Sequence, residues 1–224
     1  MEVRLISYSQ PVKDKLFVGE DIQELIAYCA RVSNPDNQAS AQTSDKLLKY
    51  LIREKHWSPF EMVSACLEIT TTRDIARQIL RHRSFSFQEF SQRYADPTQH
   101  LKSVRREARL QDLNNRQNSI EVVDNSLQQQ WMGHQDAVYL ASIKAYTWAL
   151  EMGIAKEQAR AVLPEGLMES RLYVNGTLRS WIHYIELRQA NGTQKEHREI
   201  ARACADVITK IFPMGKDYLA PPRL

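Results

Sequence analysis

The sequence predicts an α+β fold in which helices flank a small mixed or antiparallel sheet. Three segments are predicted as strands, residues 2–8, 62–72 and 168–175. In the second of these, alternate apolar residues fall on one face, as in a half-buried strand. Helical segments with recognisable caps separate the strands. The longest helical segment, residues 124–152, is too long for the core of one small domain, so we expect it at a subunit interface.

The first half of the chain contains three predicted helices. Asp21 and Glu24 form a capping box at the start of the first helix, which ends before Pro35. Ser44 is expected to cap the second helix, and residues 73–83 form the third.

The second half begins with a polar segment, residues 97–120, which lacks a clear period and is predicted as a long excursion. In the long helix that follows, apolar residues repeat at heptad spacing, and a second apolar stripe runs beside them. A helix that is apolar on two faces is expected to pack against another subunit. Shorter helices are predicted over residues 156–163, 177–189 and 195–212.

Composition places the chain among globular proteins. Its 224 residues suffice for one domain, 1–224, with 43% hydrophobic and 25% charged residues. No apolar run reaches the length of a membrane span, and the N-terminus lacks the layout of a signal peptide, so a cytoplasmic location without membrane contact is expected. The net charge of +3 is too small to indicate general nucleic-acid binding.

Cysteine and glycine usage restricts the chemistry. Cys29, Cys66 and Cys204 are far apart and lie in apolar patterns, so neither a redox pair nor a metal site is predicted. The seven glycines form no glycine-rich phosphate loop. Any phosphate would have to be bound by Arg side chains, hydroxyls and helix N-termini.

The most informative segment is residues 81–93, which begins with Arg81, His82 and Arg83 and continues with aromatic residues interleaved with polar ones. This mixture suits a pocket wall that binds a flat, charged ligand. A helix C-terminus followed by a strand with alternating faces explains the segment equally well.

The spacing of this segment, Arg-His-Arg and then Ser91 after seven residues, resembles the motif of the flavin-dependent thymidylate synthases. Further matches follow in the family's order, at residues 30–33, 56–61, 76–78, 159–164, 178–179 and 186–188.

The resemblance implies reductive methylation of deoxyuridine monophosphate (dUMP) to thymidylate. In that reaction 5,10-methylenetetrahydrofolate supplies the carbon, and FAD reduced by NADPH supplies the hydride. A homotetramer with active sites shared between subunits is also implied. No cysteine nucleophile is expected, because buried thiols are poorly ionised.

The resemblance further implies particular site residues. Arg188 is expected to activate dUMP, since a cation at the uracil edge stabilises the ring anion. The other positions matched to dUMP binding are Gln78, Arg81, Glu89, Phe90, Ser91, Gln92, Arg93 and Arg160. The positions matched to FAD binding are Ser33, Ser58, Glu61, Arg81, His82, Arg83, Ser84, Glu89, Thr177, Leu178, Arg179 and His183, with His56 near flavin and folate.

Two other functions remain open from sequence. An RNA-binding module would explain the basic and aromatic residues 81–94, although acidic residues nearly balance the basic ones. A catalytically inactive relative, assembled through the long helix, would retain the motifs without the reaction.

Overall fold

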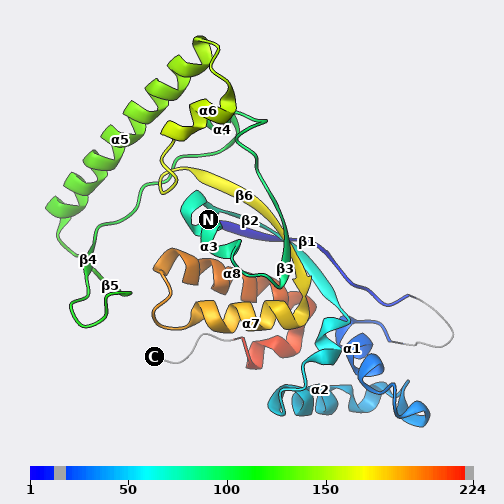
Figure 1. Cartoon of the computed structure of the whole chain (residues 1–224). Coiled ribbons are helices and arrows are strands. Elements are labelled where there is room, and N and C mark those ends of the chain that lie inside the picture. The colour runs from blue at the N-terminus through cyan, green and yellow to red at the C-terminus, as the bar shows by residue number, and fades with distance from the viewer. Residues whose placement is uncertain (13–18, 220–224) are drawn as a thin grey trace.

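A four-stranded antiparallel sheet lies at the centre of the molecule, as the computed structural model of residues 1–12 and 19–219 shows (Figure 1). The strand order is β1-β2-β6-β3, and the longest pairing, between β2 and β6, runs from Ser64 opposite Thr177 to Thr72 opposite Glu169. The strands are β1 (Glu2–Tyr8), β2 (Ser64–Thr72), β3 (Phe85–Glu89) and β6 (Glu169–Thr177). The predicted α+β class is therefore confirmed.

Helices cover one face of this sheet, with α7 and α8 packed beneath it (Figure 1). A separate two-stranded hairpin joins β4 (Arg109–Gln111) to β5 (Ser119–Glu121). The helices are α1 (Ile22–Ala30), α2 (Ser44–Arg53), α3 (Arg73–Ile79), α4 (Pro97–His100), α5 (Asn125–Glu151), α6 (Lys156–Ala159), α7 (Leu178–Gln189) and α8 (Lys195–Ile211). Among the described residues, no helix is both long and apolar enough to cross a membrane.

The core lies between the sheet and these helices. Leu172 and Val174 of β6 are buried on the helix side, whereas Arg171 and Tyr173 point to the opposite, exposed side. Trp181 of α7 is fully buried, and its indole Nε1 donates a hydrogen bond to the carbonyl of Ala65 at 3.0 Å. The strand alternation expected from sequence therefore fixes which face receives the helices.

Helix α5 extends away from the sheet and meets α6 near its C-terminal end (Figure 1). Its 27 residues begin after Asp124, where the predicted segment starts, and the Asp124 carboxylate caps the helix. Tyr146 and Ala149 pack against α6 and the following turn, whereas the heptad stripe remains exposed, with Trp148 56% accessible. The long helix is confirmed, and its place at a subunit interface stays a prediction.

The predicted helix 73–83 is shorter than expected, because α3 ends at Ile79. The chain then turns and enters β3, where Phe85 pairs with Gly176. Sheet pairing at Phe85 ends the helical segment early. The Ser44 cap was also wrong: Thr43 occupies the N-cap position, and the Ser44 hydroxyl is buried without a hydrogen-bond partner.

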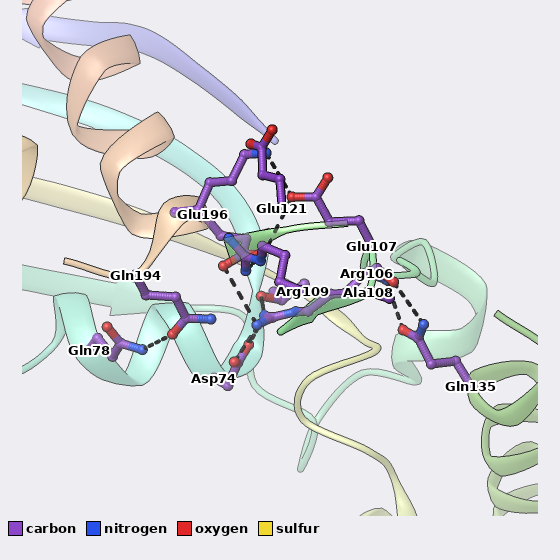
Figure 2. A network of polar contacts seen from close by, with 12 residues as sticks. Asp74, Gln78, Arg106, Glu107, Ala108, Arg109, Glu121, Gln135, Gln194 and Glu196 are labelled. Carbon is purple, nitrogen blue, oxygen red and sulfur yellow. Dashed lines mark hydrogen bonds and ion pairs between the residues drawn. The ribbon is translucent and has the colours of Figure 1, made fainter. Parts of the chain in front are cut away.

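The polar segment 97–120 contains regular structure that its sequence did not indicate. It contains α4 and most of the β4–β5 hairpin. Gln135 of α5 accepts from the Arg106 amide N–H and donates to the Arg106 carbonyl, each at 2.8 Å (Figure 2). Gln128 bonds the backbone of Ala108 in the same way. The side-chain amides of Gln135 and Gln128 thus take the hydrogen bonds that a neighbouring strand would otherwise make with this backbone. The segment is held by these bonds and not by a buried apolar face, so its sequence shows no apolar periodicity.

Candidate active site

A chain of polar contacts connects the turn after α3 to α7 and α8. Arg188 donates from Nε to His82 Nε2 at 2.9 Å. The ring of His82 lies edge-on to Tyr184, with 4.9 Å between centroids. Tyr184 in turn lies 3.2 Å from Nε2 of His197, whose Nδ1 lies 3.2 Å from the Gln78 side-chain oxygen. Residues about 100 positions apart are therefore joined in one network.

Both histidines of this network are held neutral. Burial, helped by the positive charges of Arg188 and Arg81, lowers the pKa of His82 to about 4. Burial and the same cations, with His82, lower the pKa of His197 to about 3. A neutral His82 has a lone pair on Nε2, which accepts the hydrogen bond from the Arg188 Nε–H. Burial also lowers the pKa of Arg188.

A second group of charges surrounds Glu89 at the end of β3. Its carboxylate accepts two hydrogen bonds from Arg77, at 2.8 and 3.0 Å, and one from Ser170 at 2.8 Å. Arg73 lies 3.5 Å away and also pairs with Glu165 at 3.4 Å. Glu89 is thereby fixed between α3 and β6, with its charge balanced by two guanidinium groups.

The loop after β3 completes this side of the molecule. Arg93 pairs with Glu157 at 3.0 Å, and the amide nitrogen of the Gln92 side chain is buried without a hydrogen-bond partner. Burial lowers the pKa of Arg73, and the nearby positive charges of Arg77 and Arg160 act in the same direction against the raising effect of Glu89. Arg160 therefore lies close enough to α3 to add to the same positive region. Clustered guanidinium groups suit an anionic ligand, and an unpartnered buried amide is a further donor on the same loop as Arg93.

The matched residues of the 56–61 and 177–183 segments form a third group. Arg179 forms an ion pair with Glu61, and the ring of His183 lies 4.8 Å from that of Trp57. Thr177 caps α7 by accepting from the Ser180 N–H at 3.2 Å.

The turn that carries Ser84 is tied to this third group. The Ser180 hydroxyl donates to the Ser84 carbonyl at 3.2 Å. Leu178 is buried in the core, and its backbone N–H donates to the Val63 carbonyl at 3.0 Å.

Some predicted residues are not joined to these groups. Ser33 is exposed after α1, and His56 is exposed with its ring 6.0 Å from that of Tyr50. Arg81 and Arg83 are exposed at the turn after α3, and Arg81 acts on the first group only through its charge, which lowers the pKa of His82.

Sequence reasoning missed His197, Tyr184 and Gln194. Gln194 accepts from the Gln78 side-chain amide at 2.8 Å (Figure 2). His197 lies one turn before the apolar face of α8 and is completely buried. A histidine in such a pattern is a signal that could have found it, because burial of an imidazole requires hydrogen-bond partners.

Comparisons with known proteins agree with one another. The family described as "Thymidylate synthase complementing protein" matches residues 15–214. A protein of Paramecium bursaria Chlorella virus 1, named as a probable flavin-dependent thymidylate synthase, is 50% identical over 95% of this chain and 96% of its own. A flavin-dependent thymidylate synthase of Synechocystis is 51% identical over the same shares.

Solved structures share the fold. A UMP/dUMP methylase from Streptomyces cacaoi, bound with 5-Br dUMP, superposes with a TM-score of 0.75 at 24% identity, over 98% of this chain and 96% of that one. The same enzyme bound with 5-Br UMP gives a TM-score of 0.75 at 25% identity, over 97% and 92% of the two chains.

Proposed function

We propose, from the premise that this chain belongs to the flavin-dependent thymidylate synthases, that the three residue groups around His82, Glu89 and His183 serve one active site. The chain is a methyltransferase that converts dUMP to thymidylate, with 5,10-methylenetetrahydrofolate as the carbon donor. It uses FAD as cofactor and NADPH as co-substrate. The observation that supports the site most directly is the Arg188 guanidinium fixed against a neutral His82.

Arg188 is proposed to activate dUMP. Only its Nε is engaged by His82, and no other hydrogen bond of this side chain is found among the described residues. The two terminal nitrogens are thus available for the uracil edge. Because Arg188 is partly buried, its charge acts through little water and stabilises negative charge on the ring strongly. That stabilisation raises the electron density at the carbon that receives the methyl group.

The remaining dUMP contacts are proposed around Glu89 and the following loop. A nucleotide phosphate is bound best by guanidinium groups and hydroxyl or amide donors. The buried, unpartnered amide of Gln92 is such a donor. The proposed residues are Gln78, Arg81, Glu89, Phe90, Ser91, Gln92, Arg93 and Arg160.

The residues proposed to hold FAD fit that group by their chemistry. The N-terminus of α7 and the exposed Arg83 suit a pyrophosphate, and the aromatic rings of Trp57 and His183 suit a flat ring system. FAD supplies the hydride when bound, and these side chains orient it and exclude water. The proposed residues are Ser33, Ser58, Glu61, Arg81, His82, Arg83, Ser84, Glu89, Thr177, Leu178, Arg179 and His183, with His56 toward the folate.

A homotetramer is proposed to complete the site. Ser33 and His56 are exposed, and so is the stripe of α5 that carries Val138 and Trp148. Large exposed apolar stripes on a helix favour packing against another subunit. We also propose that residues 1–224 form one domain and that the protein acts in the cytoplasm without nucleic-acid or membrane partners.

The test is the absorption spectrum of the purified protein together with tritium release from C5-labelled dUMP. A yellow protein that releases tritium only with NADPH and methylenetetrahydrofolate is expected. A colourless protein that shifts RNA in a gel would contradict the function. A yellow protein that never forms thymidylate would instead identify an inactive relative.

A further inference from the structure

A cavity of about 600 Å³ lies between the β4–β5 hairpin and the first turns of α5 and α8. None of the residues proposed for dUMP or FAD lines it. The lining residues that matter here are Arg106, Arg109, Arg116, Leu127, Trp131, Lys195 and Arg198.

Cationic side chains dominate the lining of the cavity. Among the described residues, five cationic side chains line it, against a single carboxylate, Glu107. Carboxylates anchor three of these cations. Arg106 pairs with Asp74 at 2.7 Å and Arg109 with Glu196 at 2.5 Å (Figure 2). Lys195 pairs with Glu107 and Glu121 at 2.7 Å each. These pairs fix the walls of the cavity.

The two other cations have unused binding capacity. Arg116 and Arg198 have no carboxylate within 4 Å in the part of the chain that the structure describes, and the Arg198 Nε is buried without a hydrogen-bond partner. A buried guanidinium N–H without a partner is costly unless a ligand supplies an acceptor. One terminal nitrogen of Arg109 is also buried without a hydrogen-bond partner.

Two further features define the ligand. The N-terminus of α8, a helix of 17 residues, has no side-chain cap, because the Gln194 amide turns toward Gln78 instead. The helix dipole adds to the positive potential there. On the opposite wall, Leu127 and Trp131 offer apolar surface for a flat ring. The ligand therefore combines several anionic oxygens with a ring system.

We propose that this cavity binds the phosphate-bearing, adenosine half of NADPH. This inference rests on the proposed function, in which dUMP and FAD have matched residues and NADPH has none. The pyrophosphate and 2′-phosphate of NADPH supply the anions, and adenine supplies the ring. The cavity volume lies within the usual range for such ligands. The Gln194–Gln78 hydrogen bond connects the cavity wall to a residue proposed for dUMP, so the two sites are neighbours.

The test uses the full-length protein with Arg116→Gln alone and combined with Arg198→Gln. Arg202→Gln, on an exposed position one turn further along α8, is the matched control. Flavin reduction is followed anaerobically by stopped flow over a range of NADPH concentrations, which gives the Kd for NADPH and the limiting rate. Binding of NADP+, which cannot reduce the flavin, is measured separately by calorimetry. The Kd for NADPH should rise at least about tenfold in the double variant, with the limiting reduction rate unchanged. Arg116 is exposed, so its single variant is expected to fold normally and to show a smaller rise.

An unchanged Kd for NADPH in the double variant would overturn the proposal. So would a loss of FAD, a weaker dUMP affinity or a higher KM for folate in place of the NADPH effect, because the cavity would then serve that ligand. Calorimetry separates this result from failure of the proposed function. If the protein is colourless but its NADPH affinity still depends on these arginines, the proposed NADPH site is supported and only the proposed flavin-dependent function is contradicted.

Discussion

Acidification from pH 7.5 to 5 should destabilise the fold through His197. This side chain is fully buried, and its hydrogen bonds to Gln78 and Tyr184 connect α3, α7 and α8. Burial and the charges of Arg188, His82 and Arg81 lower its pKa from 6.5 to about 3. In the unfolded chain the imidazole takes up a proton as the pH falls below 6.5, whereas in the folded protein it stays neutral until the pH approaches 3. Stability is therefore complete above pH 6.5 and falls as the pH drops toward 3.

The magnitude follows from the interval between the unfolded pKa and the final pH. From 6.5 to 5 is 1.5 pH units, so His197 alone should lower the free energy of unfolding by about 2 kcal/mol. His82, with a pKa lowered to about 4, acts in the same direction but is partly exposed and contributes less. The carboxylates Glu68 and Glu196 have lowered pKa values and act only below their ordinary value of 4.5. The loss of unfolding free energy between pH 6.5 and 5 therefore comes from the histidines.

Urea unfolding followed by tryptophan fluorescence, at one fixed protein concentration, measures this effect. The His197→Gln variant should be less stable at pH 7.5 but should lose much less stability between pH 7.5 and 5. The exposed His134→Gln variant is the control and should behave as the parent. A parent whose unfolding free energy is flat over this range, or a His197→Gln variant with the full pH dependence, would refute the reasoning.

Three other predictions concern the absence of a cysteine nucleophile, the subunit interface at α5 and the charge of Glu89. Replacing Cys29, Cys66 and Cys204 with Ala should leave tritium release largely intact, because burial raises the pKa of all three thiols; one folded, yellow, inactive single variant would disprove this. Trp148→Glu should dissociate the oligomer in light scattering, and an unchanged mass would exclude α5 from the interface. Glu89→Gln should weaken dUMP binding about tenfold or more, because the carboxylate that fixes Arg77 and Ser170 in place would be lost; calorimetry showing parental affinity would contradict its role.

The sequence predicted most of the fold because local signals determine most of it. The start of the long helix at Asp124 and the alternating faces of β2 are properties of neighbouring residues, and both are confirmed. The end of α3 could not be placed, because pairing of Phe85 with the distant Gly176 decides it. The hairpin within residues 97–120 escaped prediction for a similar reason, since amides of α5 hold its approach.

The site was predictable only where a continuous motif carried it. Residues 81–93 indicated a ligand site, yet the contacts of Arg188 with His82 and of His197 with Gln78 join separate helices. The basic cavity likewise depends on bringing the β4–β5 hairpin to the start of α8. Such juxtapositions depend on tertiary packing and have no local signal.

The most direct test of the account is Arg188→Ala, assayed for flavin content, flavin reduction and tritium release. Loss of one preorganised charge at the reacting ring typically costs about 3–4 kcal/mol, so tritium release should fall by a factor of about 100 or more. FAD should stay bound and should still be reduced by NADPH, because Arg188 is proposed to face the uracil edge. A variant that releases tritium at the parental rate, or one that loses its flavin, would contradict the role proposed for Arg188.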